Sequence, residues 1–447
     1  MISENGNYKV LYDLSRPFVW KFTSTDAVNL LYQIHKADPM GNWVAVSGIL
    51  RQPKEYGTAG DFFINPSEIL ADEIETQIRF KNLHLAEVMY TGSVRFKLIM
   101  TEELVAPSGE IYYNSNMNAW YNTGEAYGID AATQHEETFN LSQSTFYDIY
   151  RTHMDSSTQN GLGHFLTSRP MGGGNLPFKQ SGLTKQSHTD NDYAYIFNTH
   201  KATQLRYIIS PFSEEIQAAR PNVWSGNISN ALYDGLSNKL GKGLNSIGVG
   251  VPNIIEKIGV SAWNSIKDAA YRVSYWVQDH NAAQVSEIGH YIIDKEKCST
   301  ERLRVYWKNR KGGIDGYTFN SELQVTTSVK SKLTKSPLGH RRSNTEDINS
   351  MGYLFNNTYG SSSRTLSSTN IIANETITVK SKFHIATELR WLSEIITSPQ
   401  IWVENLQTGK INAVYSVTKQ MNTKPKGKSV GQMTLSLRMS NEILTQR

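Results

Sequence analysis

Cysteine is nearly absent from this chain, whose 447 residues include only Cys298. A single thiol excludes a disulfide framework and a zinc site built from several cysteines. Charge is scarce too: 19% of the residues are charged, and 45 basic against 41 acidic side chains give a net charge of +4. So small an excess does not predict a protein that wraps nucleic acid.

Long apolar runs are also missing. No run of about 18 apolar residues occurs, so we expect no membrane-spanning helix and no stable membrane association. The first residues contain no charged leader followed by an apolar stretch, so we expect no signal peptide and synthesis in a cytoplasm. Aromatic residues at 11% and hydrophobic residues at 39% exclude a disordered chain. The length predicts two or three domains.

What the chain has instead is alternation of apolar and polar residues, for example at 94–100, 303–308 and 376–380. This period of two is typical of strands with one buried face. We therefore predict a mainly β fold with a minor α content, made of two or more β-sandwich-like domains with a helical insertion and long loops. The expected parts are an N-terminal β-sandwich-like domain at 1–115, a β-rich middle region with long loops at 116–225, a helical hairpin insertion at 226–285, and a C-terminal β domain at 286–447 with a short helix and an extended loop or arm at 333–370.

The helical insertion is predicted from apolar residues at helical spacing. One helix is expected where Leu232, Leu236, Leu240 and Leu244 recur every four residues. A second is expected from Val260, Trp263, Ile266, Ala270, Val273 and Val277. Packing in a core or between subunits is favoured for this piece over contact with a membrane surface. Two further short helices are predicted, one after Asn65 and one ending at Ser398-Pro399.

Catalytic motifs are absent. The chain has no GxSxG elbow, no HExxH and no GxGxxG pattern, so we expect no enzymatic activity and no cofactor. His188, Asp190 and Asp192 alternate and could hold a divalent cation, but their polar neighbours favour a solvated loop and no metal. His135-Glu136-Glu137 could supply an acid and a base, and exposed charge is again the favoured interpretation.

A turn motif between two strands is formed by Asn309, Arg310, Gly312, Gly313 and Asp315. The two glycines permit positive φ, so the loop can turn tightly. Asp315 can accept hydrogen bonds from loop amides, and Arg310 can pair with it or with a neighbouring carboxylate. Trp307 and Phe319 are expected to pack across the hairpin. The motif predicts a rigid structural corner that needs no substrate.

A basic run follows in a polar segment and comprises Lys330, Lys332, Lys335, Arg341 and Arg342. Such a run could touch phosphates electrostatically. We favour a solvated loop or an arm that meets an acidic neighbouring subunit.

Residues 303–319 read as an apolar strand, then Asn-Arg-x-Gly-Gly-x-Asp, then an aromatic strand. This pattern resembles virion tail proteins of bacteriophages that infect Bacteroidetes, including the crAss-like short-tailed phages. The order from Trp391-Leu392 through Ser398-Pro399 to Ser440-Asn441-Glu442 is similar as well. Weaker likenesses are Pro17-Phe18-Val19-Trp20 and Arg51-Gln52-Pro53, so the resemblance covers mainly 286–447.

The resemblance implies a virion structural protein, a subunit of a tail ring or tail hub with no catalytic residues. It implies a cyclic homo-oligomer of six- or twelve-fold symmetry that contacts other tail and neck proteins. It also implies transient passage of genomic DNA through the ring, and a protein made in the host cytoplasm and located in the virion. The alternatives are a receptor- or glycan-binding module that stacks ligands on Trp120, Tyr121, Tyr112 and Tyr113, and a cell-wall hydrolase.

Overall fold

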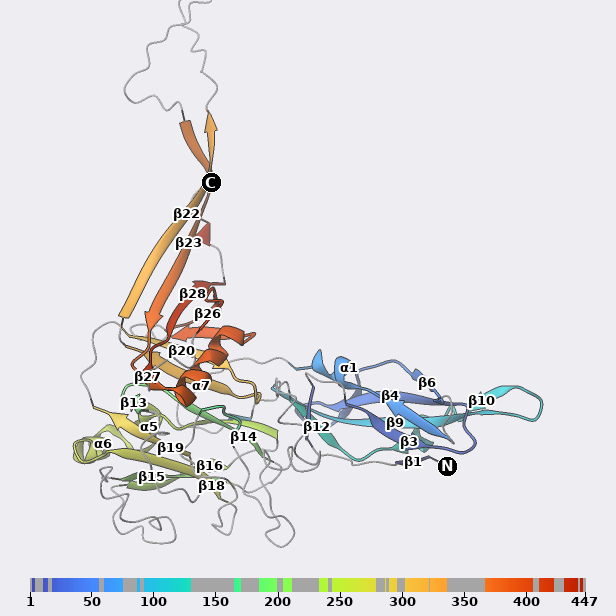
Figure 1. Ribbon diagram of the computed structural model, residues 1–447. Helices are drawn as coiled ribbons and strands as arrows, with labels where there is room; N and C mark the ends of the chain where they lie inside the picture. Colours follow the sequence, from blue (N-terminus) through green and yellow to red (C-terminus); the bar gives the residue numbers. More distant parts are fainter. Residues whose placement is uncertain are drawn as a thin grey trace, which may run out of the picture.

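The computed structural model describes residues 2–4, 11–14, 18–55, 60–74, 87–88, 92–129, 165–169, 185–198, 204–210, 233–239, 243–278, 286, 289–295, 302–320, 322–335, 366–404, 410–421, 430–440 and 443–444. Strands dominate these residues, which confirms the predicted mainly β fold. The strands fall into an N-terminal, a middle and a C-terminal unit (Figure 1).

The N-terminal unit is a sandwich of two sheets. One sheet has the order β1 (Ser3–Glu4), β3 (Trp20–Thr23), β7 (Asp61–Ile64). The other has the order β2 (Leu11–Asp13), β12 (Ala126–Ile129), β9 (Ser93–Val105), β4 (Asn29–Ala37), β5 (Trp43–Ala45), with β10 (Ile111–Tyr113) and β11 (Tyr121–Asn122) on β9 and β6 (Leu50–Pro53) on β4. Phe22 and Phe62 of the first sheet pack with Phe96 of the second in one core.

Two short helical segments complete this unit. The helix predicted after Asn65 is α1 (Ser67–Ala71), which buries Leu70 in the same core. The turn η1 (Met117–Ala119) leads into β11 and β12. Because β11 and β12 both pair with β9, the boundary predicted at residue 115 falls inside this sheet.

The middle unit also contains two sheets. One has the order β13 (Lys185–Ser187), β19 (Gly289–Asp294), β18 (Arg272–Gln278), β15 (Gln204–Ser210), β16 (Tyr233–Lys239). The other has the order β14 (Tyr193–Asn198), β17 (Gly243–Gly248), β8 (Glu87–Val88). The helices α5 (Val251–Ile258) and α6 (Val260–Ile266) supply Ile254 and Trp263 to the core between the sheets.

The predicted helical hairpin insertion at 226–285 is therefore wrong for the described residues that form β16, β17 and β18. Leu236 and Leu244 lie on strands β16 and β17, while Val273 and Val277 lie on β18. A spacing of four residues fits a strand as well as a helix, because four is a multiple of the strand period of two. Gly235 and Gly243 disfavour a helix, and β-branched valines favour a strand. Among the described residues of this segment, the helical ones are those of α5 and α6.

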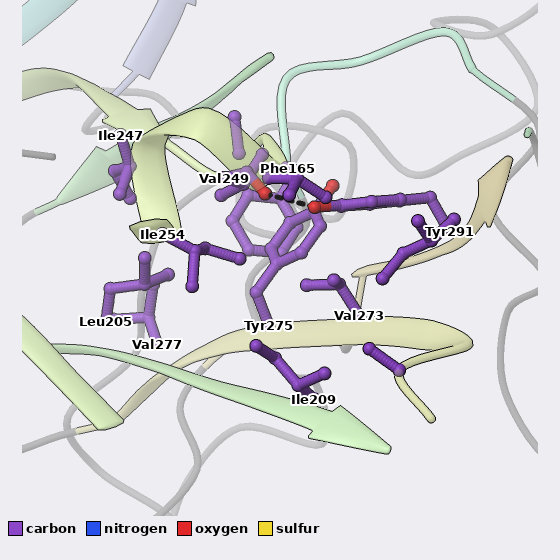
Figure 2. Close-up of a cluster of buried hydrophobic side chains, with 14 of the residues drawn as sticks. Phe165, Leu205, Ile209, Ile247, Val249, Ile254, Val273, Tyr275, Val277 and Tyr291 are labelled. Carbon is purple, nitrogen blue, oxygen red and sulfur yellow. Dashed lines mark hydrogen bonds between the residues drawn. The ribbon is translucent and has the colours of Figure 1, made fainter. Parts of the chain in front are cut away.

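Strand β14 lies between two hydrophobic cores and contributes side chains to both. Its residue Ile196 faces the middle core, where Ile247, Ile254, Val273 and Tyr275 converge and Tyr291 donates a hydrogen bond to the carbonyl of Val249 at 2.7 Å (Figure 2). Its neighbours Tyr195 and Phe197 belong to a second core that also contains Tyr127 of β12 and Tyr306 of the C-terminal unit. The apolar run Tyr-Ala-Tyr-Ile-Phe is therefore buried on both faces. This second core joins all three units.

The C-terminal unit is a sheet with one helix on it. Its order is β21 (Ile314–Phe319), β20 (Leu303–Lys308), β25 (Ile401–Glu404), β26 (Ile411–Ser416), β28 (Thr434–Met439), β23 (Leu366–Lys380), β22 (Glu322–Lys335), with β29 (Ile443–Leu444) on β23. The predicted helix ending at Ser398-Pro399 is α7 (Ala386–Thr397), which buries Leu389, Trp391, Leu392 and Ile395 on the sheet. A separate pair, β24 (His384–Ile385) and β27 (Val430–Gly431), lies beside α7.

The last two strands of this sheet run far beyond it. β22 and β23 pair from Glu322↔Lys380 to Lys335↔Leu366, whereas β28 covers β23 only at 376–380 (Figure 1). We call the paired residues 324–335 and 366–378 the ribbon. The loop predicted at 333–370 thus begins and ends as strand, at 333–335 and 366–370.

Candidate functional site

The turn motif forms a tight corner between β20 and β21. The amide of Asn309 donates to the carbonyl of Gly313 at 2.9 Å, and the side-chain oxygen of Asn309 accepts from the amides of Lys311 and Gly313. Gly312 has a φ of 88°, a value that favours glycine. The side chain of Asn309 also donates to the carbonyl of Leu166 at 2.9 Å, so the corner is attached to the segment 165–169.

Gly313 has a different role from the one predicted. Its φ is not positive, so the backbone conformation does not require glycine there. A β-carbon at Gly313 would instead lie 2.0 Å from the carbonyl oxygen of Leu166. Glycine is needed because the two backbones approach so closely that no side chain fits between them.

Asp315 holds three parts of the chain together. Its carboxylate accepts from the hydroxyl of Thr167 at 2.5 Å, from the amide of Ser168 at 3.2 Å and from the indole of Trp391 at 2.8 Å. Burial raises the pKa of Asp315, while Arg169 and the hydrogen bonds from Thr167 and Trp391 oppose the increase. Arg310 does not pair with Asp315; its Nε lies 3.1 Å from Glu394 on α7.

The aromatic contact predicted across this hairpin is only partly right. Trp307 lies opposite Asp315, and Phe319 lies opposite Leu303, so the two rings are not cross-strand neighbours. Both belong to the C-terminal core, and the ring centre of Trp307 lies 5.1 Å from that of Trp391 on α7.

A buried network of two arginines and two aspartates adjoins the turn motif. Arg169 donates two hydrogen bonds to Asp192, at 2.6 and 3.1 Å. Arg304 of β20 donates to Asp192 at 2.9 Å and lies 3.4 Å from Asp190. The loop between β13 and β14 contributes both aspartates, so the network joins the middle and C-terminal units. We call these four residues the arginine–aspartate junction.

The electrostatics of the junction are balanced. Burial alone would raise the pKa of Asp192, but Arg169 and Arg304 outweigh it and lower the pKa. Burial alone would lower the pKa of Arg304, but Tyr306, Asp190 and Asp192 raise it. Arg169, Asp192 and Arg304 therefore stay charged, and each arginine faces a carboxylate. The pairing connects the segment 165–169, the β13–β14 loop and β20 in one buried network.

The structure changes the interpretation of the His188 region. Asp190 and Asp192 are buried in the junction, so the predicted solvated loop is wrong for them, whereas His188 is exposed. Within the described ranges, no group of three or more His, Cys, Asp or Glu residues could hold a metal ion. The aspartates face arginines instead.

The junction arginines were missed in the sequence, although a pattern marked one of them. Arg304 lies within the run Leu-Arg-Val-Tyr-Trp-Lys, and all six residues of this strand are buried. An arginine in a buried strand requires a carboxylate partner. Arg169 follows no pattern that would reveal its burial, because its partners are Asp192 in the β13–β14 loop, the carbonyl of Gly316 on β21 and the ring of Trp391 on α7.

The proposed stacking residues are only partly exposed. Trp120 is 3% exposed, packs against Leu31 and Ile99, and donates to the carbonyl of Asn114 at 2.6 Å. It therefore cannot serve as a platform for a ligand. Tyr112, Tyr113 and Tyr121 are exposed.

The remaining predicted residues fall on the ribbon or outside the described residues. Lys330, Lys332 and Lys335 lie on β22, where the pairing with β23 shifts between Lys330 and Lys332. Arg341, Arg342, Cys298 and His135-Glu136-Glu137 lie outside the described residues. Across the described residues, no helix has both the length and the apolar character needed to cross a bilayer.

Comparison with known proteins adds no family. No protein-family model matches the chain, and no curated protein matches its sequence.

Proposed function

We propose that this chain is a bacteriophage virion structural protein, a subunit of a tail ring or tail hub that assembles into part of the DNA-conducting tail. The ribbon is the observation that carries the proposal. Side chains 324–328 of β22 are exposed on both faces of the sheet, and Val325 is 56% exposed. A two-stranded hairpin on its own is at best marginally stable in water. Beyond β28, the described chain adds to the ribbon only the two residues of β29, opposite Ile372 and Ala373. The ribbon therefore suits a segment that is completed by a partner.

The length of the ribbon fits contact with a neighbouring subunit. β22 has 14 residues, which at about 3.3 Å per residue span about 45 Å. Only its first residues lie beside the part of β23 that β28 supports. The remainder extends away from the sheet (Figure 1). A segment of this length reaches a second copy placed next to the first.

The rest of the molecule supports an architectural role. Three units share one core around β14, and the arginine–aspartate junction ties the middle unit to the C-terminal one. A rigid block of this kind keeps its shape when copies are packed side by side. We propose a wall element that performs no catalysis.

The proposal follows the resemblance in its partners. The partners would be further copies in a six- or twelve-fold ring, other tail and neck proteins, and genomic DNA in passage. A head-to-tail interface that closes on itself produces such a ring. The assembled protein would be located in the virion after synthesis in the host cytoplasm.

The test is the oligomeric state of the full chain and of a variant without the ribbon. Thr327 and Glu375 are register partners, so residues 328–374 can be replaced by a two-residue Asn-Gly turn. Native mass spectrometry and negative-stain electron microscopy should show a closed ring for the full chain and monomers for the variant, with circular dichroism as the control for folding. A full chain that stays monomeric, or a variant that still forms rings, would overturn the proposal.

A further inference from the structure

The partner surface for the ribbon can be sought on the chain itself, because charge is unevenly distributed along the sequence. Residues 1–129 contain ten Lys and Arg against 15 Asp and Glu, a net charge of −5. Residues 303–447 contain 20 Lys and Arg against nine Asp and Glu, a net charge of +11. The near-neutral total conceals an acidic N-terminal unit and a basic C-terminal unit. Opposite charges of this size attract the acidic N-terminal unit of one copy to the basic C-terminal unit of another.

Three exposed acidic groups lie with apolar residues at one end of the N-terminal unit. Pro53, Asn29, Glu103 and Tyr113 form one row across β6, β4, β9 and β10. Beyond this row lie the exposed carboxylates of Asp26, Glu55 and Glu110. The same end exposes the apolar and aromatic side chains of Val28, Val105, Ile111, Tyr112 and Tyr113. We call this end of the sheet the distal tip.

The distal tip has the composition of an interaction surface. Ile111 is 58% exposed, and all three residues of β10 are exposed. An exposed apolar patch with a polar rim marks a protein contact more often than a surface left to solvent. The rim carries the carboxylates of Asp26, Glu55 and Glu110, and Lys54, which donates to the carbonyl of Thr25 at 3.5 Å, is the basic residue among them, so the net charge of the rim favours a basic partner.

The ribbon has the complementary charge. Its outer residues, 329–335 and 366–374, contain three lysines and no carboxylate. Lys330, Lys332 and Lys335 all belong to β22, which is the edge strand of the sheet. An edge strand also offers unpaired backbone groups to a partner.

The two surfaces cannot meet within one molecule. The β9–β10 hairpin projects from the end of the N-terminal unit that lies away from the other units, and the ribbon leaves the C-terminal unit in another direction (Figure 1). A contact between them therefore joins two copies. In such a pair, the distal tip of one copy and the ribbon of the other remain free to bind further copies. This is a head-to-tail interface.

We infer that the basic ribbon of one copy binds the acidic and apolar distal tip of a second copy. The inference rests on the proposed function only in assigning the ribbon to assembly, and it adds which surface the ribbon binds. The segment 329–335 would lie along the end of the sheet that carries Asp26, Glu55 and Glu110, and the apolar residues of β10 would be covered.

A charge exchange tests the contact. The ribbon variant is Lys330→Glu with Lys332→Glu, and the tip variant is Asp26→Lys with Glu110→Lys. Either variant should raise the dissociation constant of self-association at least about tenfold, because attraction is replaced by repulsion. An equimolar mixture of the two variants should form assemblies in which the two variants alternate. The reversed ribbon of one variant meets the reversed tip of the other, and the unchanged ribbon of the second meets the unchanged tip of the first. A chain that carries both reversals should regain the association of the wild-type protein in sedimentation velocity at low salt.

Matched reversals at other exposed sites serve as controls. Glu68→Lys with Asp72→Lys changes the charge of the same unit by the same amount on and beside α1, outside the tip. Lys410→Glu with Lys419→Glu does so in the C-terminal unit, outside the ribbon. Both controls should associate as the wild-type protein does.

The outcomes separate this contact from the proposed function. Rings that persist in the ribbon and tip variants would overturn the contact and leave the architectural role standing. A wild-type chain that is monomeric at every concentration would overturn both. If the ribbon variant loses binding to a DNA duplex in a gel-shift assay while its self-association is unchanged, the ribbon binds nucleic acid and the inference is wrong.

Discussion

Asn309, with its two neighbouring glycines, shows how one turn serves two backbones. Its side chain closes the β20–β21 corner through two amides and binds the carbonyl of Leu166 in the segment 165–169. Gly312 supplies the positive φ, and Gly313 supplies the space beside Leu166. The motif therefore fixes a local turn and a contact between units at the same time.

Gly313→Val should destabilise the protein through a steric clash. The β-carbon would lie 2.0 Å from the carbonyl oxygen of Leu166, so one of the two backbones has to move. We expect a loss of about 2–3 kcal/mol in the free energy of unfolding, measured by urea denaturation. Gly48→Ala is the control, because its β-carbon meets nothing within 4 Å. A Gly313→Val protein of unchanged stability would show that this close approach is not needed.

The sequence predicted a turn at this motif, which the structure contains, but it assigned the wrong role to Gly313. Positive φ is a local property, and two adjacent glycines gave no means of telling which one adopts it. The contact with Leu166 lies nearly 150 residues away in the chain, so local patterns contain no information about it.

Glu394 on α7 should make stability depend on pH. Burial and the nearby charge of Asp315 raise its pKa to about 7, although Ser168 and Arg310 oppose the increase. The folded protein then holds a proton that the unfolded chain releases at its ordinary pKa of 4.5. The contribution of this group is fully present below about pH 4.5 and is lost as the pH rises through about 7.

Glu394→Gln should remove this dependence. The variant cannot ionise, so its stability relative to the wild-type protein should increase from pH 5 to pH 8 by about 2 kcal/mol. Thermal or urea unfolding at several pH values measures the difference, and Glu110→Gln on the surface is the control. A constant difference across this range would contradict the raised pKa.

At the scale of elements, β22 is the strand whose surroundings should change most on assembly. It is the edge of its sheet, and side chains 324–328 are exposed. Hydrogen exchange followed by mass spectrometry should show fast exchange over 324–335 in the monomer and slow exchange in the assembled protein. β20 lies between two strands and is fully buried, so it should exchange slowly in both states. Equal exchange of β22 in both states would mean that no partner covers it.

Elements with strict alternation were predictable, and those built on mixed periods were not. Strands β9, β20 and β28 and helix α7 follow one period clearly. The leucines at 232–248 fit the helical spacing and the strand period of two equally well, and residues 233–239 form a strand because they pair with β15. That pairing depends on residues about 30 positions earlier, which a local window does not include.

At the scale of the whole molecule, the arginine–aspartate junction should couple the middle and C-terminal units. Arg304→Met leaves Asp190 facing one cation fewer in a buried site, and we expect a loss of about 3–5 kcal/mol. The same change in an Asp190→Asn background should cost less by at least about 1 kcal/mol, because the two groups interact. A double-mutant cycle from urea denaturation measures this coupling, and additive effects would show that the pair is not coupled.

The junction and the uneven charge are the features that the sequence left hidden. Asp190 and Asp192 stood among polar residues, and nothing nearby indicated that Arg169 and Arg304 would cover them. The charge difference between the two ends was readable from composition alone, but only once the structure had shown which residues form a unit.

The contacts around β14 also determine the order in which the chain can be completed during synthesis. Two residues of β8 pair with β17, which is made more than 150 residues later, and Asp315 needs both Thr167 and Trp391. The N-terminal sandwich can form early as the chain leaves the ribosome at about 5–20 residues per second. The contacts at the centre of the molecule cannot be completed until Trp391 has been synthesised. A chain truncated before Trp391 would therefore fold its N-terminal sandwich but lack the contacts that hold the three units together.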